Sequence, residues 1–352
     1  MMQRRTFLPL LATAGLAQEE ADKKVFSTTV NVVVAPVTVT DKDGRHVSGL
    51  EGKDFTLFDN EKSQDIRVDV SFIPISMVVA VQSNDSVEVI LPAIKKIGPL
   101  IEGLVIGTQG EAAILAFDHR LRVMQQFTGD GRLLTAALAK INAGSSTSAM
   151  IDSVFEATRM LRRRPQSHRK ILLLITESRD GGSEGRLREA LLEAQIHNVI
   201  VYTININRAL GMFTKKMPVP RPDPFPVGAR PVPGGAPMTP GTTEALTGYR
   251  GQSANFVPVF IEIFKQAKGL FVDNPAEVMT QYTGGREFSF INQKSLEEAM
   301  SKLGEELHSQ YLLSYTPNNL QQGGWHDIRV DVAKNALEVR TRRGYWMASV
   351  PR

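Results

Sequence analysis

The stretch Ser76-Met77-Val78-Val79-Ala80-Val81 is a continuous apolar run that begins with a single serine. A second run, Ile171-Leu172-Leu173-Leu174-Ile175, is still more apolar. Strands of a parallel sheet show such runs because helices cover the sheet on both faces. The two runs therefore predict central strands of a parallel sheet.

Helices and strands are predicted to alternate on either side of these runs. Apolar residues recur at helical spacing between Val87 and Leu104, and further strands and helices follow as far as the strand 311–315. Such alternation predicts an α/β fold with a doubly wound, mostly parallel sheet. We expect this α/β domain to span residues 75–317.

Two segments that flank this domain have a different pattern. Residues 25–73 and 318–348 show the two-residue alternation of antiparallel strands, interrupted by turns such as Asp41-Lys42-Asp43-Gly44. Neither segment is large enough to be stable alone. We therefore expect both to join into one small antiparallel β module.

A proline-rich insertion covers residues 208–256. Because proline lacks a backbone N–H, this segment cannot supply a regular ladder of hydrogen bonds. Two interpretations stay open, a flexible tether and a polyproline strip that binds a partner.

The N-terminus, residues 1–17, is typical of an export signal. Arg4-Arg5-Thr6-Phe7-Leu8 resembles a twin-arginine motif and precedes a short apolar stretch. That stretch is too short to span a membrane, and we expect no membrane span in the mature protein. The prediction is a periplasmic or extracellular protein, the alternative for these residues being a frayed helix.

Composition narrows the classes of function. The chain has no cysteine, which excludes disulfides and thiolate metal sites. Its formal charge of +4 arises from mixed charges, whereas nucleic-acid-binding proteins concentrate Lys and Arg on one face. We therefore expect no nucleic-acid partner.

The chain resembles the von Willebrand factor A-related domain proteins of acidobacteria and their relatives. The stretch from Val37 to Arg45 and Lys53-Asp54-Phe55 carry the resemblance near the N-terminus, and the stretch from Tyr311 to Pro317 and Arg343-Gly344-Tyr345 carry it near the C-terminus. The resemblance implies a von Willebrand factor A-like domain in an exported binding protein that is not an enzyme. Its expected partner is a protein or a peptide.

The resemblance also implies a place for a divalent ion. The family motif is Asp-x-Ser-x-Ser after the first strand, then a Thr, then an Asp after a later strand. These positions fall here, in chain order, on Gln82, Asn84, Ser86, Ser148 (or its neighbour Thr147) and Glu177. Only Ser86 is unchanged, one carboxylate is lost, and Gln and Glu are longer than Asp.

These replacements predict a degenerate metal site that holds no ion. Mg²⁺, the ion that the site would hold if it retained one, demands near-ideal octahedral oxygen geometry. Asp85 could compensate for the lost carboxylate only if the loop register shifts. The alternative for Gln82 and Glu177 is a hydrogen-bonded polar pair at the sheet edge. The predicted ligand-binding surface is therefore Gln82, Asn84, Asp85, Ser86, Ser148 and Glu177.

Two other functions stay open. Gly181-Gly182-Ser183-Glu184-Gly185 matches the Gly-x-Ser-x-Gly pattern of serine hydrolases, in which the serine follows its strand directly. Here residues 177–180 intervene, and the alternative is that Ser183 caps the next helix. The other possibility is a structural scaffold that acts through the β module and the proline-rich insertion.

Overall fold

The computed structural model describes residues 32–69, 73–177, 179–206, 209, 274–319, 322–334 and 336–347 of the 352-residue chain. Several predictions lie outside the described residues. They concern the export signal over 1–17, residues 25–31 of the β module, a helix over 256–267 and, apart from Ala209, the proline-rich insertion over 208–256.

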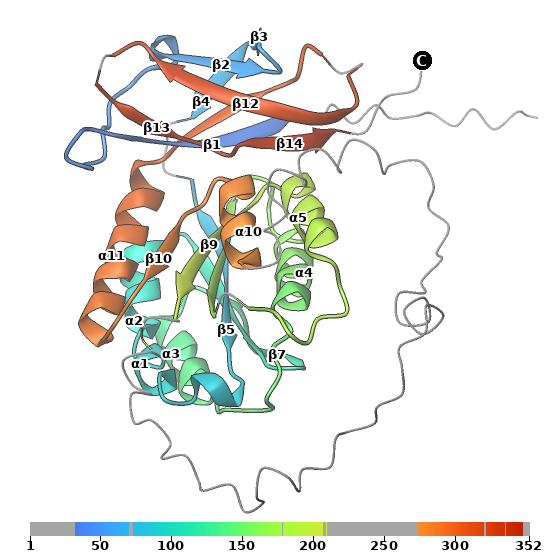
Figure 1. Cartoon of the computed structure of the whole chain (residues 1–352). Helices are drawn as coiled ribbons and strands as arrows, with labels where there is room; N and C mark the ends of the chain where they lie inside the picture. The colour runs from blue at the N-terminus through green and yellow to red at the C-terminus, as the bar shows by residue number, and fades with distance from the viewer. Residues whose placement is uncertain are drawn as a thin grey trace, which may run out of the picture. The chain divides into compact units, whose positions relative to one another are not determined.

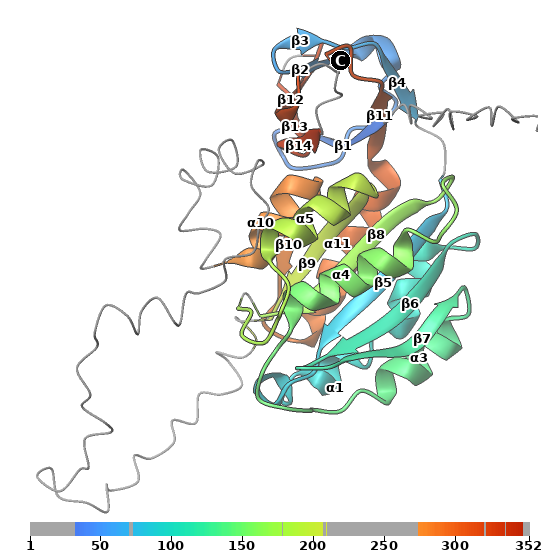
Figure 2. The ribbon, with the colours of Figure 1, turned by 90° about the vertical axis from the view of Figure 1, so that its right-hand side faces the viewer.

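A six-stranded sheet forms the centre of the α/β domain (Figures 1 and 2). Its strands, in order, are β10 (Glu287–Ser289), β9 (Val199–Asn205), β8 (Arg169–Thr176), β5 (Ile75–Gln82), β6 (Glu111–Phe117) and β7 (Leu121–Thr128). Only the pairing of β7 with β6 is antiparallel. The apolar runs lie in β5 and β8, whose residues are all buried. The predicted α/β fold with a mostly parallel sheet is confirmed.

Helices cover both faces of this sheet. One face packs against α3 (Gly131–Ala139) and α11 (Gln293–Ser309), in a cluster that includes Met77, Val79 and Val81 of β5. The alternate residues Val78 and Ala80 face the other layer. That layer consists of α4 (Met150–Leu161), α5 (Leu187–Ile196) and α10 (Pro275–Thr283).

The helical spacing between Val87 and Leu104 corresponds to several short segments rather than one helix. These segments are the 3-10 turn η2 (Asp85–Val87), α1 (Leu91–Ile94), α2 (Gly98–Leu100) and the π-helical η3 (Ile101–Ile106). Pro92 and Pro99 are the second residues of α1 and α2, in the first turn, where a missing N–H costs no hydrogen bond. The prolines therefore restart the helix, although Val87, Ile90, Ile94 and Ile97 are buried as the spacing predicts.

The β module consists of two four-stranded sheets that share one apolar core. The first contains, in order, β13 (Glu338–Arg340), β1 (Val33–Thr40), β11 (Tyr311–Tyr315) and β4 (Ile66–Asp69). The second contains β14 (Gly344–Met347), β12 (Gly324–Val332), β2 (Phe55–Asp59), which follows the 3-10 turn η1 (Gly52–Asp54), and β3 (Lys62–Ser63). Strands from both flanking segments pair directly, with Ile328 opposite Asp59.

The prediction that residues 311–315 form the last strand of the α/β domain is wrong. This strand, β11, lies between β1 and β4 of the β module. Its alternate residues Tyr311, Leu313 and Tyr315 are buried, whereas the strands at the centre of the parallel sheet are buried at every position. Alternation is the pattern of an antiparallel strand with one buried face.

Hydrogen bonds join the β module to the amino end of the parallel sheet. Arg169, the first residue of β8, donates to the Leu307 carbonyl and to Gln310 Oε1. Gln310 Nε2 donates to Thr38 Oγ1 of β1 at 3.2 Å. Arg340 of β13 donates to the carbonyls of Gly284 and Gly285 after α10. The opposite, carboxyl end of the sheet is therefore bordered by loops rather than by the module. Within the described ranges, no helix combines the length and apolarity needed to cross a membrane.

Candidate functional site

Three loops meet at the carboxyl end of the parallel sheet. They comprise residues 83–90 after β5, residues 140–149 before α4 and residues 177–186 after β8. The Asp85 amide donates to the Ser145 carbonyl at 3.0 Å, and the Gly181 amide donates to the Ser148 carbonyl at 3.1 Å. These bonds hold the loops together where ligands bind in open α/β sheets.

Gln82, the last residue of β5, is held in one orientation. The Thr176 hydroxyl and the Glu177 amide donate to Gln82 Oε1 at 2.7 and 2.8 Å. Because a backbone N–H can only donate, the carboxamide oxygen must face it. The two N–H groups of Gln82 Nε2 therefore point away from the Thr176 hydroxyl and the Glu177 amide, toward the loops.

Those N–H groups bind two predicted site residues. Gln82 Nε2 donates to Asn84 Oδ1 at 2.9 Å and to Glu177 Oε2 at 3.0 Å. Ser86 Oγ lies 2.9 and 3.1 Å from the same two oxygens, so its single proton is shared between them. Gln82, Asn84, Ser86 and Glu177 form what we call the carboxyl-edge cluster.

Hydrogen bonds inside the carboxyl-edge cluster occupy oxygens that a divalent cation would need. The two oxygens that would face the ion, on Asn84 and Glu177, instead face N–H donors of Gln82. Turning the Gln82 carboxamide oxygen inward would direct its NH₂ group at the Glu177 amide and break two hydrogen bonds.

Ser148 and Asp85 lie in the same three loops but outside the hydrogen-bond network of the cluster. The Ser148 side chain is buried, and its hydroxyl has no partner among the described residues. Asp85 is exposed, and its amide rather than its carboxylate binds the neighbouring loop. Thr147, the alternative to Ser148, is exposed.

Asp118 is a site residue that the sequence interpretation missed. It follows β6 at the carboxyl edge, is fully buried, and accepts from the Arg120 amide at 2.7 Å and the Ser145 amide at 3.4 Å. Burial opposes its charge, but these bonds and the nearby Arg122 guanidinium lower its pKa below the ordinary value. Asp118 thus positions the loop of Ser145. Its place directly after a strand was the available signal.

Ser183 caps a different helix from the one predicted. Its hydroxyl donates to Asp180 Oδ1 at 2.8 Å and accepts from the Asp152 amide at 3.1 Å. Asp180 also accepts from the Met150 amide at 2.7 Å. Ala149, the residue before α4, has no side chain that can cap the helix. The 177–186 loop supplies the cap instead.

These contacts differ from those of a serine hydrolase. Among the described residues, the Ser183 hydroxyl is hydrogen-bonded to the Asp152 amide and to Asp180, and not to a histidine. A second serine, Ser145, lies 2.5 Å from His119 Nδ1, and Asp118 Oδ1 lies 3.4 Å from the same nitrogen. In a catalytic triad the acid binds the opposite ring nitrogen. Neither serine therefore has the geometry of a triad.

The β module contains a second polar cluster, which periodicity did not reveal. Asp59 accepts from His326 Nδ1 at 2.5 Å and from the hydroxyls of Tyr315 and Tyr345 at 2.8 and 2.7 Å. His326 Nε2 faces the Gln322 carbonyl at 2.5 Å. With Asp59 ionised, both ring nitrogens face acceptors, so both carry protons and His326 is an imidazolium. We call Asp59, His326, Tyr315 and Tyr345 the module cluster.

The electrostatics of the module cluster agree with this charge assignment. Burial opposes the imidazolium, but the hydrogen bonds to Asp59 and the Gln322 carbonyl outweigh it and raise the pKa of His326. Burial also opposes the Asp59 carboxylate, yet its donors lower the pKa of that carboxyl group. The cluster is a buried, internally paired ionic site.

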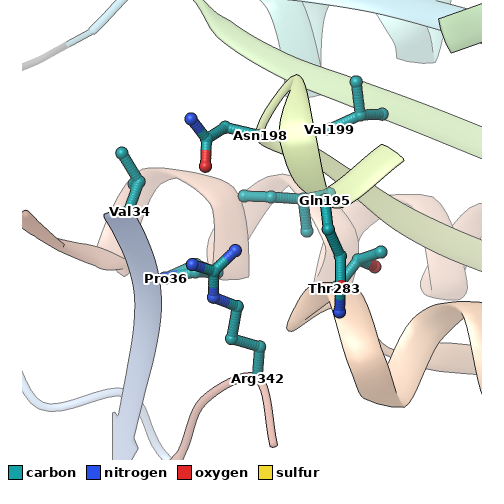
Figure 3. Close-up of a pocket in the computed structure, with 8 residues that line it drawn as sticks. Val34, Pro36, Gln195, Asn198, Val199, Thr283 and Arg342 are labelled. Carbon is teal, nitrogen blue, oxygen red and sulfur yellow. The ribbon is translucent and has the colours of Figure 1, made fainter. Parts of the chain in front are cut away.

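A small pocket lies where the β module meets α5 and α10. Arg342 extends into it, and Figure 3 shows that side chain near Pro36, with Asn198 and Thr283 among the other lining residues. Its space is about that of one water molecule. The carboxyl ends of α5 and α10 contribute Gln195 and Thr283, and helix carboxyl ends attract cations such as a guanidinium. The pocket is a feature of the junction rather than a ligand site.

Comparisons with known proteins found similar solved structures but no matching family. No family model matches the chain, and no curated protein matches it. Solved structures that resemble it include the conserved hypothetical protein BatB from Bacteroides thetaiotaomicron, with 16% identity and a TM-score of 0.40 over 66% of this chain and 98% of that one. An aerotolerance-related membrane protein from Bacteroides fragilis has 15% identity and a TM-score of 0.38 over 65% and 98%.

A third similar structure is the VWA domain of SpRpn10, with 14% identity and a TM-score of 0.33 over 38% of this chain and 75% of that one. Likenesses of this strength carry no argument about function. The six-stranded, mostly parallel sheet with helices on both faces, beside a separate antiparallel module, fits a von Willebrand factor A-like domain.

Proposed function

We propose that the protein is a non-enzymatic binding protein that recognises a protein or peptide through the carboxyl edge of its α/β domain, without a metal ion. The observation that carries the proposal is the carboxyl-edge cluster. Three loops are fixed there by backbone hydrogen bonds, and polar side chains gather at the place where open α/β sheets bind ligands.

Metal independence follows from the donors inside the cluster. In a metal site, a cation holds the oxygens of several loops together. Here the carboxamide of Gln82 does so, because its N–H groups bind Asn84 and Glu177 while its oxygen binds the start of the 177–186 loop. The loops therefore keep their positions without an ion, and a preformed surface loses less conformational entropy on binding.

The position of the β module supports the choice of surface. Hydrogen bonds of Arg169 and Gln310 join the β module to the amino end of the sheet. The module therefore occupies that end. At the carboxyl edge, Asp85, Ser86 and Glu184 are exposed. A partner can thus reach the carboxyl edge without displacing the module.

The test is capture of a partner by the mature protein in EDTA, by cross-linking in a lysate or envelope extract of the source cell, followed by affinity measurement with the purified partner. Asn84→Ala, Ser148→Ala and Glu177→Ala are expected to weaken binding, by about tenfold or more at the residues that dominate the interface. Glu305→Ala, an exposed glutamate near the amino end, is the matched control and should leave affinity unchanged. Equal affinity of all variants would contradict the proposal.

The scaffold alternative predicts a different pattern. If the β module and the proline-rich insertion carry the interactions, deletion of residues 210–250 should abolish capture while the three alanine variants bind normally. Export remains a prediction from residues 1–17, and cell fractionation of a tagged full chain with Arg4→Lys and Arg5→Lys tests it.

A further inference from the structure

The hydrogen-bond donors of the carboxyl-edge cluster are already bound to acceptors within the protein. Both hydrogens of Gln82 Nε2 are directed at Asn84 Oδ1 and Glu177 Oε2, and the Ser86 hydroxyl is directed at the same two oxygens. Asn84 Nδ2 donates to the Ser146 carbonyl at 3.3 Å. The amides of Asp85 and Glu177 are also occupied by neighbouring groups. An acidic group of a partner would find few N–H donors here.

Acceptors, by contrast, remain at the same place. Glu177 is half-buried and uses Oε2 in the cluster, while its Oε1 has no partner within the described ranges. The exposed carboxylate of Asp85 likewise makes no bond to a described residue. No ion pair of Glu177 or Asp85 is present among the described residues, so neither charge is neutralised by contact.

Ser148, in a neighbouring loop, is a second polar group with unused hydrogen-bonding capacity. Its side chain is 6% exposed, and its hydroxyl is a buried polar atom without a hydrogen-bond partner in the described chain. Such orphan groups are uncommon in folded proteins because leaving them unpaired costs free energy. The Ser148 carbonyl binds the amides of Gly181 and Gly182, so the residue belongs to the two loops that border Glu177.

From this balance of donors and acceptors we infer that the carboxyl edge takes a cationic side chain of its partner, a lysine ammonium or an arginine guanidinium, on Glu177 Oε1. The inference rests on the proposed function and names the chemistry of its partner. A metal-bridged site would take an acidic group, whereas the built-in donor Gln82 leaves Glu177 as an uncompensated anion. The cation supplies both the missing charge and the missing donors, and charge-assisted hydrogen bonds are the strong ones.

The experiment uses the mature full chain, labelled with ¹⁵N, in EDTA. N-acetylated and C-amidated Gly-Lys-Gly, Gly-Arg-Gly and Gly-Glu-Gly are the probes, and the side-chain amide signals of Gln82 and Asn84 are the readout. We expect the two basic peptides to shift these signals and the acidic peptide not to do so. The shifts should weaken as NaCl rises, because salt screens exposed charges.

Glu177→Gln is the decisive variant, because it removes the charge and keeps a hydrogen-bonding group of the same size. Its affinity for the basic peptides should fall by about tenfold or more. Glu305→Gln, the matched control, should bind them as the wild type does. Preserved amide dispersion in the variant's spectrum shows that it is folded. Absence of any shift with basic peptides, or equal affinity of the Glu177→Gln variant, would overturn the inference.

Failure of this inference is distinguishable from failure of the proposed function. If a captured partner loses affinity for the Asn84→Ala and Ser148→Ala variants but binds Glu177→Gln normally, the edge binds partners and the charge inference is wrong. If the partner binds all alanine variants normally, the proposed function is wrong, whatever the tripeptides do.

Discussion

The module cluster and the carboxyl-edge cluster are both polar networks, but they differ in how completely they are paired. In the module cluster, the side chains of Asp59 and His326 are fully buried, and each charge faces its opposite. In the carboxyl-edge cluster, Ser86 and Glu177 reach the surface, and the Glu177 charge has no ionic partner among the described residues.

This difference indicates which network stabilises the fold and which is available for binding. A buried and fully satisfied ionic network contributes specificity to the fold, and breaking it is costly. A network at a surface that keeps one carboxylate oxygen unpaired has a bond left to make. The predictions below test this contrast in order of decreasing effect.

Asp59→Ala should have the largest effect. It leaves the His326 imidazolium and the hydroxyls of Tyr315 and Tyr345 buried without their acceptor. Removing one partner of a buried ion pair costs about 3–5 kcal/mol. Urea unfolding measures the loss, and Asp331→Ala, an exposed aspartate of the same module, should cost less than about 1 kcal/mol. A loss from Asp59→Ala no greater than that of the control would refute the assigned role.

Gln82→Leu should have an intermediate effect. The variant leaves the Glu177 amide without an acceptor, whereas the Thr176 hydroxyl keeps a bond to the Glu177 carbonyl. One unsatisfied buried donor costs about 1–3 kcal/mol. Urea unfolding again gives the value. Unchanged stability would mean that Gln82 does not hold the loops together.

The pH dependence of unfolding should show the charge on His326. Because its pKa is raised in the folded state, its stabilising contribution is present below its unfolded pKa, about 6.5, and is lost as pH rises through the folded value. Asp59 has a lowered pKa, so its contribution is present above its unfolded pKa and is lost as pH falls through the folded value. Thermal unfolding of wild type and His326→Gln from about pH 5 to about pH 9 tests whether the contribution of His326 is lost as pH rises. A parallel pH profile in the variant would show that His326 is not charged.

Ser148→Ala should have the smallest effect on stability. Its buried hydroxyl has no partner among the described residues, so its removal should change the free energy of unfolding by less than about 0.5 kcal/mol or stabilise the fold. Ser153→Ala is the matched control, because the buried Ser153 hydroxyl donates to the Met150 carbonyl at 2.6 Å and its loss should cost about 1 kcal/mol. A larger loss from Ser148→Ala than from the control would show that its hydroxyl is paired in the protein.

Much of the fold follows from local pattern. The apolar runs of β5 and β8 mark the sheet centre because burial on both faces leaves no polar position. The strand 311–315 was assigned to the wrong sheet because the helix before it in sequence lies in the α/β domain, although its alternate burial is that of the module.

The site was predictable in place but not in chemistry. Parallel strands share a carboxyl end, and this predicts that Gln82, Asn84 and Glu177 lie together. The direction of the Gln82 carboxamide depends on the Glu177 amide, which no spacing reveals. The module cluster joins Asp59 to His326 across 267 positions of the chain, and no local period predicts such a contact.

Metal independence is the central claim, and thermal unfolding of the protein tests it most directly. The protein is unfolded in EDTA and then in millimolar Mg²⁺, Mn²⁺ or Ca²⁺. An ion that binds only the native state at a hundredfold excess over its dissociation constant would stabilise it by about 2.7 kcal/mol. We expect the same Tm in EDTA and with each ion. A clear rise in Tm that Glu177→Ala abolishes would contradict it and show that the carboxyl-edge cluster binds metal.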